Sequence, residues 1–354
     1  MLLALGLLGG GARWWLPGRA LAPRPTPQVR GRLDSTATLL ADGTILVVGG
    51  RPFPGTATAI AERFDPRTGL WHDAGRLRAA RTRHTASLLT DGSVVIVGGT
   101  GAGMWPWQRG ALPTVERYRP ATNRWSTLAP LPQGVTGHSA VVLADGRLLV
   151  AGGRDRTGNP SAATAAVWAY DPLRDRWAAL APLHVPRDKS VMVSLSDGRV
   201  LIVGGADVFY PSQSPSAEVY DPQQDRWQPG ATLGVGLVGY QRAARLTDGR
   251  ALVADGDDVF LYEPALDRWA RAAPGAKRAT AGTLTALPDG RALQVAGAIQ
   301  ACYDPANDRW QIAQRAIYRA FHTATLLPDG RVVLLGGQSV DDVGPGHDVE
   351  FIQP

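Results

Sequence analysis

The chain has 354 residues, including 42 glycines, 27 prolines and a single cysteine, Cys302. One cysteine excludes an internal disulfide and a cysteine-based metal cluster. The formal charge of +6 comes almost entirely from arginines that are spread along the chain, which excludes a long basic surface for nucleic acid.

Residues 1–12 are apolar and small. They are too short for a membrane span, which needs ~20 apolar residues, so no transmembrane segment is expected. They are similar to the apolar core of a secretory signal, with Gly10 and Ala12 before a cleavage point, although the positively charged start is missing. We therefore expect a truncated signal and a secreted or periplasmic protein, with a cytoplasmic location as the alternative.

From residue 42 onward an Asp-Gly pair recurs seven times, each time between two short apolar runs. The pairs begin at Asp42, Asp91, Asp145, Asp197, Asp248, Asp289 and Asp329, at intervals of 49, 54, 52, 51, 41 and 40 residues. Asp-Gly between apolar runs is a strong hairpin signal, because both turn positions need positive φ. A period of this length built from short strands indicates a β-propeller.

Each unit is predicted to contain four strands. The first two flank the Asp-Gly turn, and the third ends in an aromatic residue, as at Tyr220. After a short turn the fourth begins with a tryptophan, seven residues after this aromatic, as at Trp227. We expect these large rings to pack between neighbouring blades rather than to bind a ligand.

Seven hairpins stand against only six tyrosine–tryptophan units, because the chain stops after a third strand at residues 349–354. Near the N-terminus, the segment from Arg13 to Pro17 resembles the fourth strand that begins at Arg124. We therefore expect this segment to supply the missing outer strand of the last blade and to remove an open sheet edge.

The units resemble kelch repeats, with a double glycine after the second strand and then a spaced tyrosine and tryptophan. The double glycine occurs five times and is replaced by Asp255-Gly256 and Ala296-Gly297 in units five and six. The resemblance covers residues 13–354. It implies an all-β, seven-bladed kelch-type β-propeller in one domain, with four-stranded blades and an N-terminal strand closing the last blade.

The loops between second and third strands share one face with the connections between blades, and this face surrounds the channel mouth. Two of these loops carry large rings outside the repeat pattern, at Trp105, Trp107 and Tyr210. Such residues on loops are typical of a contact surface, and the alternative is that they fold back over the blades.

Polar residues recur where one blade passes into the next. Arginine stands ten residues before the Asp-Gly pair at Arg32, Arg81, Arg187 and Arg319, and histidine stands seven before it at His84, His138 and His322. We expect the arginines to form a positive ring that binds carboxylates through paired hydrogen bonds. The histidines lie on separate blades, so we expect no metal site and no other cofactor.

Three functions are weighed. Copper radical oxidases resembling galactose oxidase share the propeller but need a cysteine cross-linked to a tyrosine, and Cys302 lies beside Tyr303 inside a third strand, so this chemistry is not expected. The preferred interpretation is a monomeric, non-catalytic propeller that binds a protein or an anionic or glycan ligand at the mouth. The alternative is a sugar mutarotase of the sialic-acid type, in which a histidine acts as acid or base beside a mouth arginine.

Overall fold

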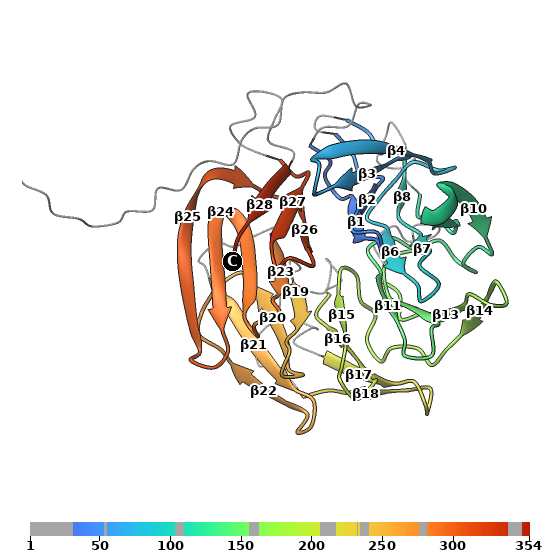
Figure 1. Ribbon diagram of the computed structural model, residues 1–354. Helices are drawn as coiled ribbons and strands as arrows, with labels where there is room; N and C mark the ends of the chain where they lie inside the picture. The colour runs from blue at the N-terminus through green and yellow to red at the C-terminus, as the bar shows by residue number, and fades with distance from the viewer. Residues whose placement is uncertain are drawn as a thin grey trace, which may run out of the picture.

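The computed structural model describes residues 31–52, 55–102, 110–155, 163–205, 217–231, 233, 241–275, 282–338 and 349–354. In these ranges seven antiparallel sheets stand around a central axis as the blades of a propeller (Figure 1), and one further two-stranded sheet joins β5 (Arg81–Thr82) to β8 (Thr100–Gly101). The helical element described there is a 3-10 turn, η2 (Pro120–Thr122). No helix in the same ranges has the length and apolar character of a membrane span. The predicted seven-bladed, all-β architecture is confirmed.

Blades one to three each contain four strands. Blade one has β1 (Thr36–Leu39), β2 (Ile45–Val48), β3 (Ile60–Asp65) and β4 (Leu70–Arg76). Blade two has β6 (Thr85–Leu88), β7 (Val94–Val97), β9 (Val115–Arg119) and β10 (Arg124–Leu128). Blade three has β11 (Ser139–Val142), β12 (Leu148–Ala151), β13 (Val167–Asp171) and β14 (Arg176–Ala179).

Blades four and five repeat this pattern. Blade four has β15 (Val191–Ser194), β16 (Val200–Val203), β17 (Ala217–Asp221) and β18 (Arg226–Pro229). Blade five has β19 (Arg242–Arg245), β20 (Ala251–Asp255), β21 (Asp258–Glu263) and β22 (Arg268–Arg271). The second strand of each blade is buried on both faces, because it packs between the two neighbouring blades.

Blades six and seven differ from the others because each has three described strands instead of four. Blade six has β23 (Thr283–Ala286), β24 (Ala292–Asp304) and β25 (Arg309–Arg319), and blade seven has β26 (Thr323–Leu326), β27 (Val332–Leu335) and β28 (Val349–Ile352). The long β24 holds both the second and third strands predicted for its blade, since only Gly297-Ala298 separates them and Gly297 has φ +57°. The predicted closing strand of blade seven, residues 13–17, lies outside the described residues.

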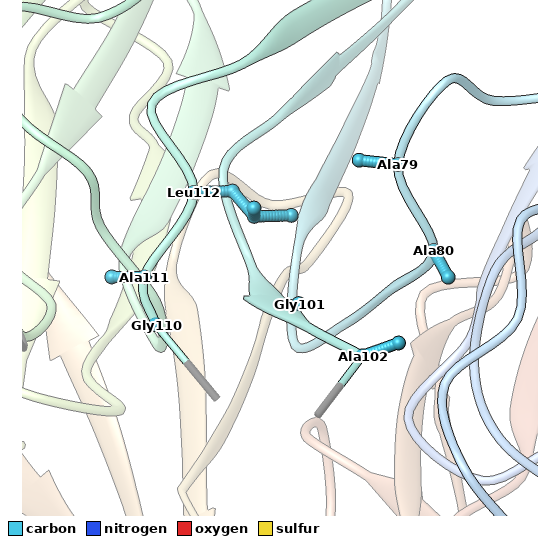
Figure 2. A pocket seen from close by; sticks show the side chains of 7 residues that line it. All are labelled: Ala79, Ala80, Gly101, Ala102, Gly110, Ala111 and Leu112. Atoms are coloured by element: carbon cyan, nitrogen blue, oxygen red, sulfur yellow. The ribbon is translucent and has the colours of Figure 1, made fainter. Parts of the chain in front are cut away.

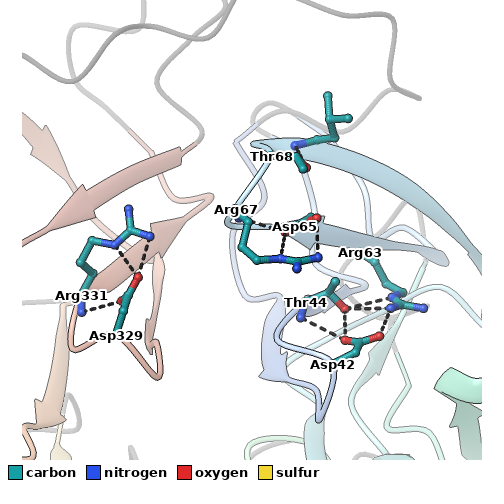
Figure 3. Close-up of polar contacts among 9 residues, drawn as sticks. Asp42, Thr44, Arg63, Asp65, Arg67, Thr68, Asp329 and Arg331 are labelled. Atoms are coloured by element: carbon teal, nitrogen blue, oxygen red, sulfur yellow. Dashed lines mark hydrogen bonds and ion pairs between the residues drawn. The ribbon is translucent and has the colours of Figure 1, made fainter.

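The Asp-Gly hairpins are held by their own aspartates. In blade one Asp42 accepts hydrogen bonds from the backbone N–H and hydroxyl of Thr44 and pairs with Arg63 of β3 (Figure 3). In blades three to seven an arginine follows the glycine and pairs with the turn aspartate, as Arg331 does with Asp329 at 2.7 Å. These turns lie on the face opposite the channel mouth described below.

The tryptophans join neighbouring blades at the outer edge, as predicted. Trp177 donates its indole N–H to the carbonyl of Ala129 in the preceding blade at 2.9 Å, while the backbone N–H of Ala129 donates to Asp175 at 3.0 Å. The same two-point contact recurs at the junctions of blades three and four, four and five, and five and six. Each indole also packs against the aromatic residue of its own third strand, with ring centroids 4.9–5.1 Å apart.

The ring closes between blades seven and one through their inner parts. The first strands β1 and β26 are neighbours, like the first strands of every other adjacent pair of blades. The backbone N–H of Gly337 donates to the carbonyl of Arg32 at 3.0 Å, as Gly50 does to Arg81 and Gly153 to Arg187 at other junctions. The first strands therefore surround a central channel, and the connections around its mouth hold the candidate site.

Candidate functional site

The four predicted mouth arginines are buried inside their blades. Arg81 and Arg187 are 0% exposed, and Arg32 and Arg319 are 2% and 3% exposed. Each guanidinium reaches the third-strand glutamate of the blade whose first strand follows it along the chain. The pairs are Arg32–Glu62, Arg81–Glu116 (2.6 Å), Arg187–Glu218 (3.0 Å) and Arg319–Glu350 (3.8 Å).

Backbone carbonyls take up further donors of the same arginines. Arg81 donates to Gly98 and Thr114, Arg187 donates to Gly204 and Arg319 donates to Gly336, at 2.7–3.1 Å. The carbonyl of the first glycine in each of these double glycines thus accepts a hydrogen bond from a buried arginine. The prediction of an open positive ring was wrong, because each charge is neutralised by a glutamate inside the protein.

The repeats themselves hold the signal for these pairs. Wherever the arginine is absent, the residue two positions before the third-strand aromatic is apolar instead of glutamate. In blade three Val135 stands opposite Trp168, and both belong to one apolar cluster. The same substitution appears in the sequence as Val238 with Phe260 and as Ala279 with Ala301. A comparison of these two columns would have predicted ion pairs rather than ligand contacts.

The three histidines are also buried, and they join first strands of neighbouring blades. Nε2 of each ring is hydrogen-bonded to a threonine hydroxyl of the preceding blade. The pairs are Thr36–His84 (3.0 Å), Thr85–His138 (2.9 Å) and Thr283–His322 (3.1 Å). At the junction of blades three and four, the hydroxyl of Ser139 donates to the carbonyl of Ser190 at 2.6 Å. These positions therefore join the blades.

Burial, followed by the charge of the Arg81 guanidinium, lowers the pKa of His84 to about 3. Burial likewise lowers the pKa of His138 to about 4. Both rings are neutral at physiological pH and 5–6% exposed. Within the described ranges no three histidine, cysteine or acidic side chains are grouped as a metal site would need.

One junction exchanges all three of its usual residues. At blades five and six, Arg242 takes the place of the threonine, Asp255 that of the first glycine and Gly282 that of the histidine. The Arg242 Nε donates to the Gly282 carbonyl at 2.7 Å, and its charge is favoured by Asp255. Where a histidine is present, its ring comes within 2.8–2.9 Å of the Cβ that the first glycine lacks, as at Gly49 and Gly98, so Gly282 leaves room for Asp255 in place of that glycine.

At the five junctions where it is described, the residue before the junction position has a left-handed backbone and lies on the mouth face, the side that carries the connections between blades. Its φ is 55° at Asp34, 54° at Arg83, 68° at Gly137, 60° at Lys189 and 58° at Phe321. Backbone hydrogen bonds link the first four in turn around the mouth, at 2.8–3.4 Å. We call these five residues the mouth ring. The repeat pattern did not predict it.

Cationic side chains gather on the mouth face of blades one to four. Arg51, Arg83, Arg154 and Lys189 form what we call the cationic arc. Asp34 lies 3.7 Å from Arg51 and 4.0 Å from Arg83, and the buried Asp188 pairs with Arg154. Burial raises the pKa of Asp188, against the opposing effect of Arg154 and its cationic neighbours. Asp155, the third carboxylate here, accepts a hydrogen bond from Gln133.

One part of the cationic arc is fixed by close packing, and another part is exposed to solvent. The Asp188 carboxylate lies over Gly137, where a Cβ would come within 2.3 Å of its Oδ1, so only glycine fits there. Arg83 is 53% exposed and Lys189 is exposed as well. The outward face of Arg83 is accessible to an incoming anion.

A shallow depression of about 400 Å³ lies beside the arc, between the blade one–two connection and the second-to-third-strand loop of blade two (Figure 2). Its described lining is Ala79, Ala80, Gly101, Ala102, Gly110, Ala111 and Leu112. None of these side chains can transfer a proton or hold a charge, so the depression suits an apolar group. Trp105, Trp107 and Tyr210, the predicted contact residues, lie outside the described residues.

The kelch motif family matches residues 81–132, 136–184 and 193–234. The chain is 30% identical to mouse Kelch-like protein 35 over 180 residues, which is 48% of this chain and 28% of that protein. It is 26% identical to human Kelch-like protein 34 over 280 residues, or 73% and 40% of the two chains. The chain thus spans less than half the length of these relatives.

A solved structure of a copper-containing fungal alcohol oxidase of the AA5 family aligns with a TM-score of 0.70 and 17% identity, over 94% of this chain and 76% of that one. At this identity the likeness concerns the fold alone. In this chain the Tyr303 side chain is fully buried, and its hydroxyl donates to Asp308 at 2.8 Å.

Proposed function

Because the chain is a kelch-repeat β-propeller, we propose that it is a non-catalytic binding protein whose mouth face recognises an acidic segment of a protein partner. Kelch-repeat proteins generally bind other proteins. The observation that carries the more specific proposal is the cationic arc. Arg83, its most exposed guanidinium group, can form paired hydrogen bonds with a carboxylate.

The buried histidines argue against the mutarotase alternative. An acid or base must reach a substrate proton directly or through one water. His84 and His322 are 5–6% exposed, and the neighbouring Arg81 and Arg319 are engaged with glutamates. The apolar depression offers no replacement for these groups among its described residues.

Acidic glycans present the same carboxylate chemistry, so they belong in the same test. The wild-type protein is passed over immobilised Glu-rich peptides, Gln-rich peptides of equal length, and sialic and uronic acid conjugates. The test variant is Arg83→Asn with Lys189→Asn, since asparagine tolerates a left-handed backbone. Arg147→Asn, in a turn on the opposite face, is the matched control.

We expect the Glu-rich peptide to bind the wild type and the Arg147 variant alike, and to bind the double variant at least about tenfold more weakly. Raising the salt concentration should weaken the wild-type interaction, because exposed charges are screened. Equal binding by the double variant and the control would refute the proposal. Export remains a separate prediction that rests on residues 1–12, outside the described part of the chain.

A further inference from the structure

At blade seven the mouth ring carries an aromatic residue. Phe321 holds a left-handed backbone with φ 58° and is 42% exposed. A left-handed conformation is unfavourable for a bulky side chain, and exposure of an aromatic ring to water is unfavourable as well. The equivalent positions in blades one to four carry aspartate, arginine, glycine and lysine.

A second aromatic ring stands three residues earlier. Tyr318 is 36% exposed near the end of β25, which extends until Arg319 pairs with Gly297. Its ring lies over Gly297, where a Cβ would come within 2.9 Å of the ring carbon Cε2. Three residues before the mouth ring, blades one to four carry small or cyclic residues: Gly31, Ala80, Gly134 and Pro186.

Two exposed aromatic rings occur three residues apart here, and the equivalent positions of blades one to four carry no aromatic residue. Since the left-handed backbone is common to the mouth ring, the exposed rings are what set blade seven apart, and large apolar residues exposed in this way tend to mark a contact surface. Gly297 lies in the turn between second and third strands and Phe321 in a connection between blades, so both rings reach the mouth face. Blade seven borders blade one, where the cationic arc begins at Arg51.

We propose that Tyr318 and Phe321 form an aromatic subsite that binds an apolar or aromatic side chain of the same acidic peptide segment that the cationic arc recognises. This inference rests on the proposed function and specifies the partner further. The ligand is a segment that combines carboxylates with a large apolar residue. The arc supplies charge complementarity and fast association, and the rings supply the buried contact area that slows dissociation.

The test is selection of a phage-displayed library of random twelve-residue peptides on the full chain. The wild type is compared with Phe321→Asn, with the aromatic-retaining Phe321→Tyr, and with Arg83→Asn/Lys189→Asn. Melting temperatures of all variants are measured in parallel. Asparagine suits the left-handed backbone, so Phe321→Asn should melt at or above the wild-type temperature.

We expect the wild type and Phe321→Tyr to select peptides that combine acidic and aromatic residues, and Phe321→Asn to select acidic peptides without aromatic enrichment. The best wild-type peptide should bind Phe321→Asn about tenfold more weakly. Identical selections by wild type and Phe321→Asn, or a lower melting temperature for that variant, would overturn the aromatic subsite while leaving the arc intact. Failure of the wild type to select any acidic peptide would overturn the proposed function itself.

Discussion

The buried histidines at the blade junctions make the stability of the propeller depend on pH. His84 and His138 are neutral in the folded protein because their pKa values are lowered to about 3 and 4. In the unfolded chain each has a pKa near 6.5. Below that value the unfolded state binds more protons than the folded state, so the free energy of unfolding falls as pH falls from about 6.5 towards 4.

The magnitude follows from these values. Between pH 7.5 and 5.0 each histidine lowers the free energy of unfolding by about 2 kcal/mol, and the two together by about 4 kcal/mol. The variant that tests this is His84→Gln with His138→Gln. Glutamine already occupies the equivalent position in blade five, where Gln241 packs against Gly204 as His84 packs against Gly49.

Equilibrium denaturation in urea at pH 7.5, 6.0 and 5.0 measures the effect. The difference in unfolding free energy between pH 7.5 and 5.0 should be about 4 kcal/mol smaller in the double variant than in the wild type. His72→Gln, at an exposed position of β4, is the control and should follow the wild type. If the double variant shows the wild-type dependence on pH, the argument from buried neutral histidines is wrong.

Two further predictions concern side chains inside the blades. Replacing Arg81 alone by Val should lower the free energy of unfolding by about 3–5 kcal/mol, because Glu116 is left as an uncompensated buried charge. Adding Glu116→Trp gives the combination of Val and Trp found in blade three and should restore much of the loss. If urea denaturation shows the double variant to be no more stable than the single one, this prediction is wrong. Gln294 is 1% exposed, and its amide has no hydrogen-bond partner in the structure as described, at a position where the other blades carry Val, Ile or Leu. Gln294→Val should therefore raise the free energy of unfolding by about 1–3 kcal/mol, and a lower thermal midpoint would show that the amide has a stabilising role.

The repeat pattern was sufficient to predict the fold. The Asp-Gly pairs and the double glycines could be interpreted because turn residues are selected by the local backbone conformation. The indole of Trp177 could be placed because a large ring at the outer strand packs against the neighbouring blade. The exposure of long side chains could not be predicted in the same way. Spacing placed Arg81 and Arg187 at the start of a first strand, but a guanidinium on a long stem can turn outward or back into its own blade.

The mouth ring was beyond prediction for a related reason. A left-handed backbone is signalled in sequence by glycine, asparagine or aspartate. Arg83 and Lys189 adopt it without that signal, held by hydrogen bonds between neighbouring blades, and Phe321 adopts it without that signal as well. The candidate site therefore contains Arg83 and Lys189, which lie outside the repeat pattern, instead of the repeated arginines that the sequence predicted.

The exchanged junction between blades five and six bears on how the ring is assembled. Seven similar blades could in principle pack against the wrong neighbours, a known failure of repeat proteins. Asp255 carries the Cβ that a histidine ring would meet, so it fits against a blade without a histidine there, as at Gly282. Blade five is thereby excluded from blades that begin with histidine, so the inner contacts help to set the order of the blades as well as their cohesion.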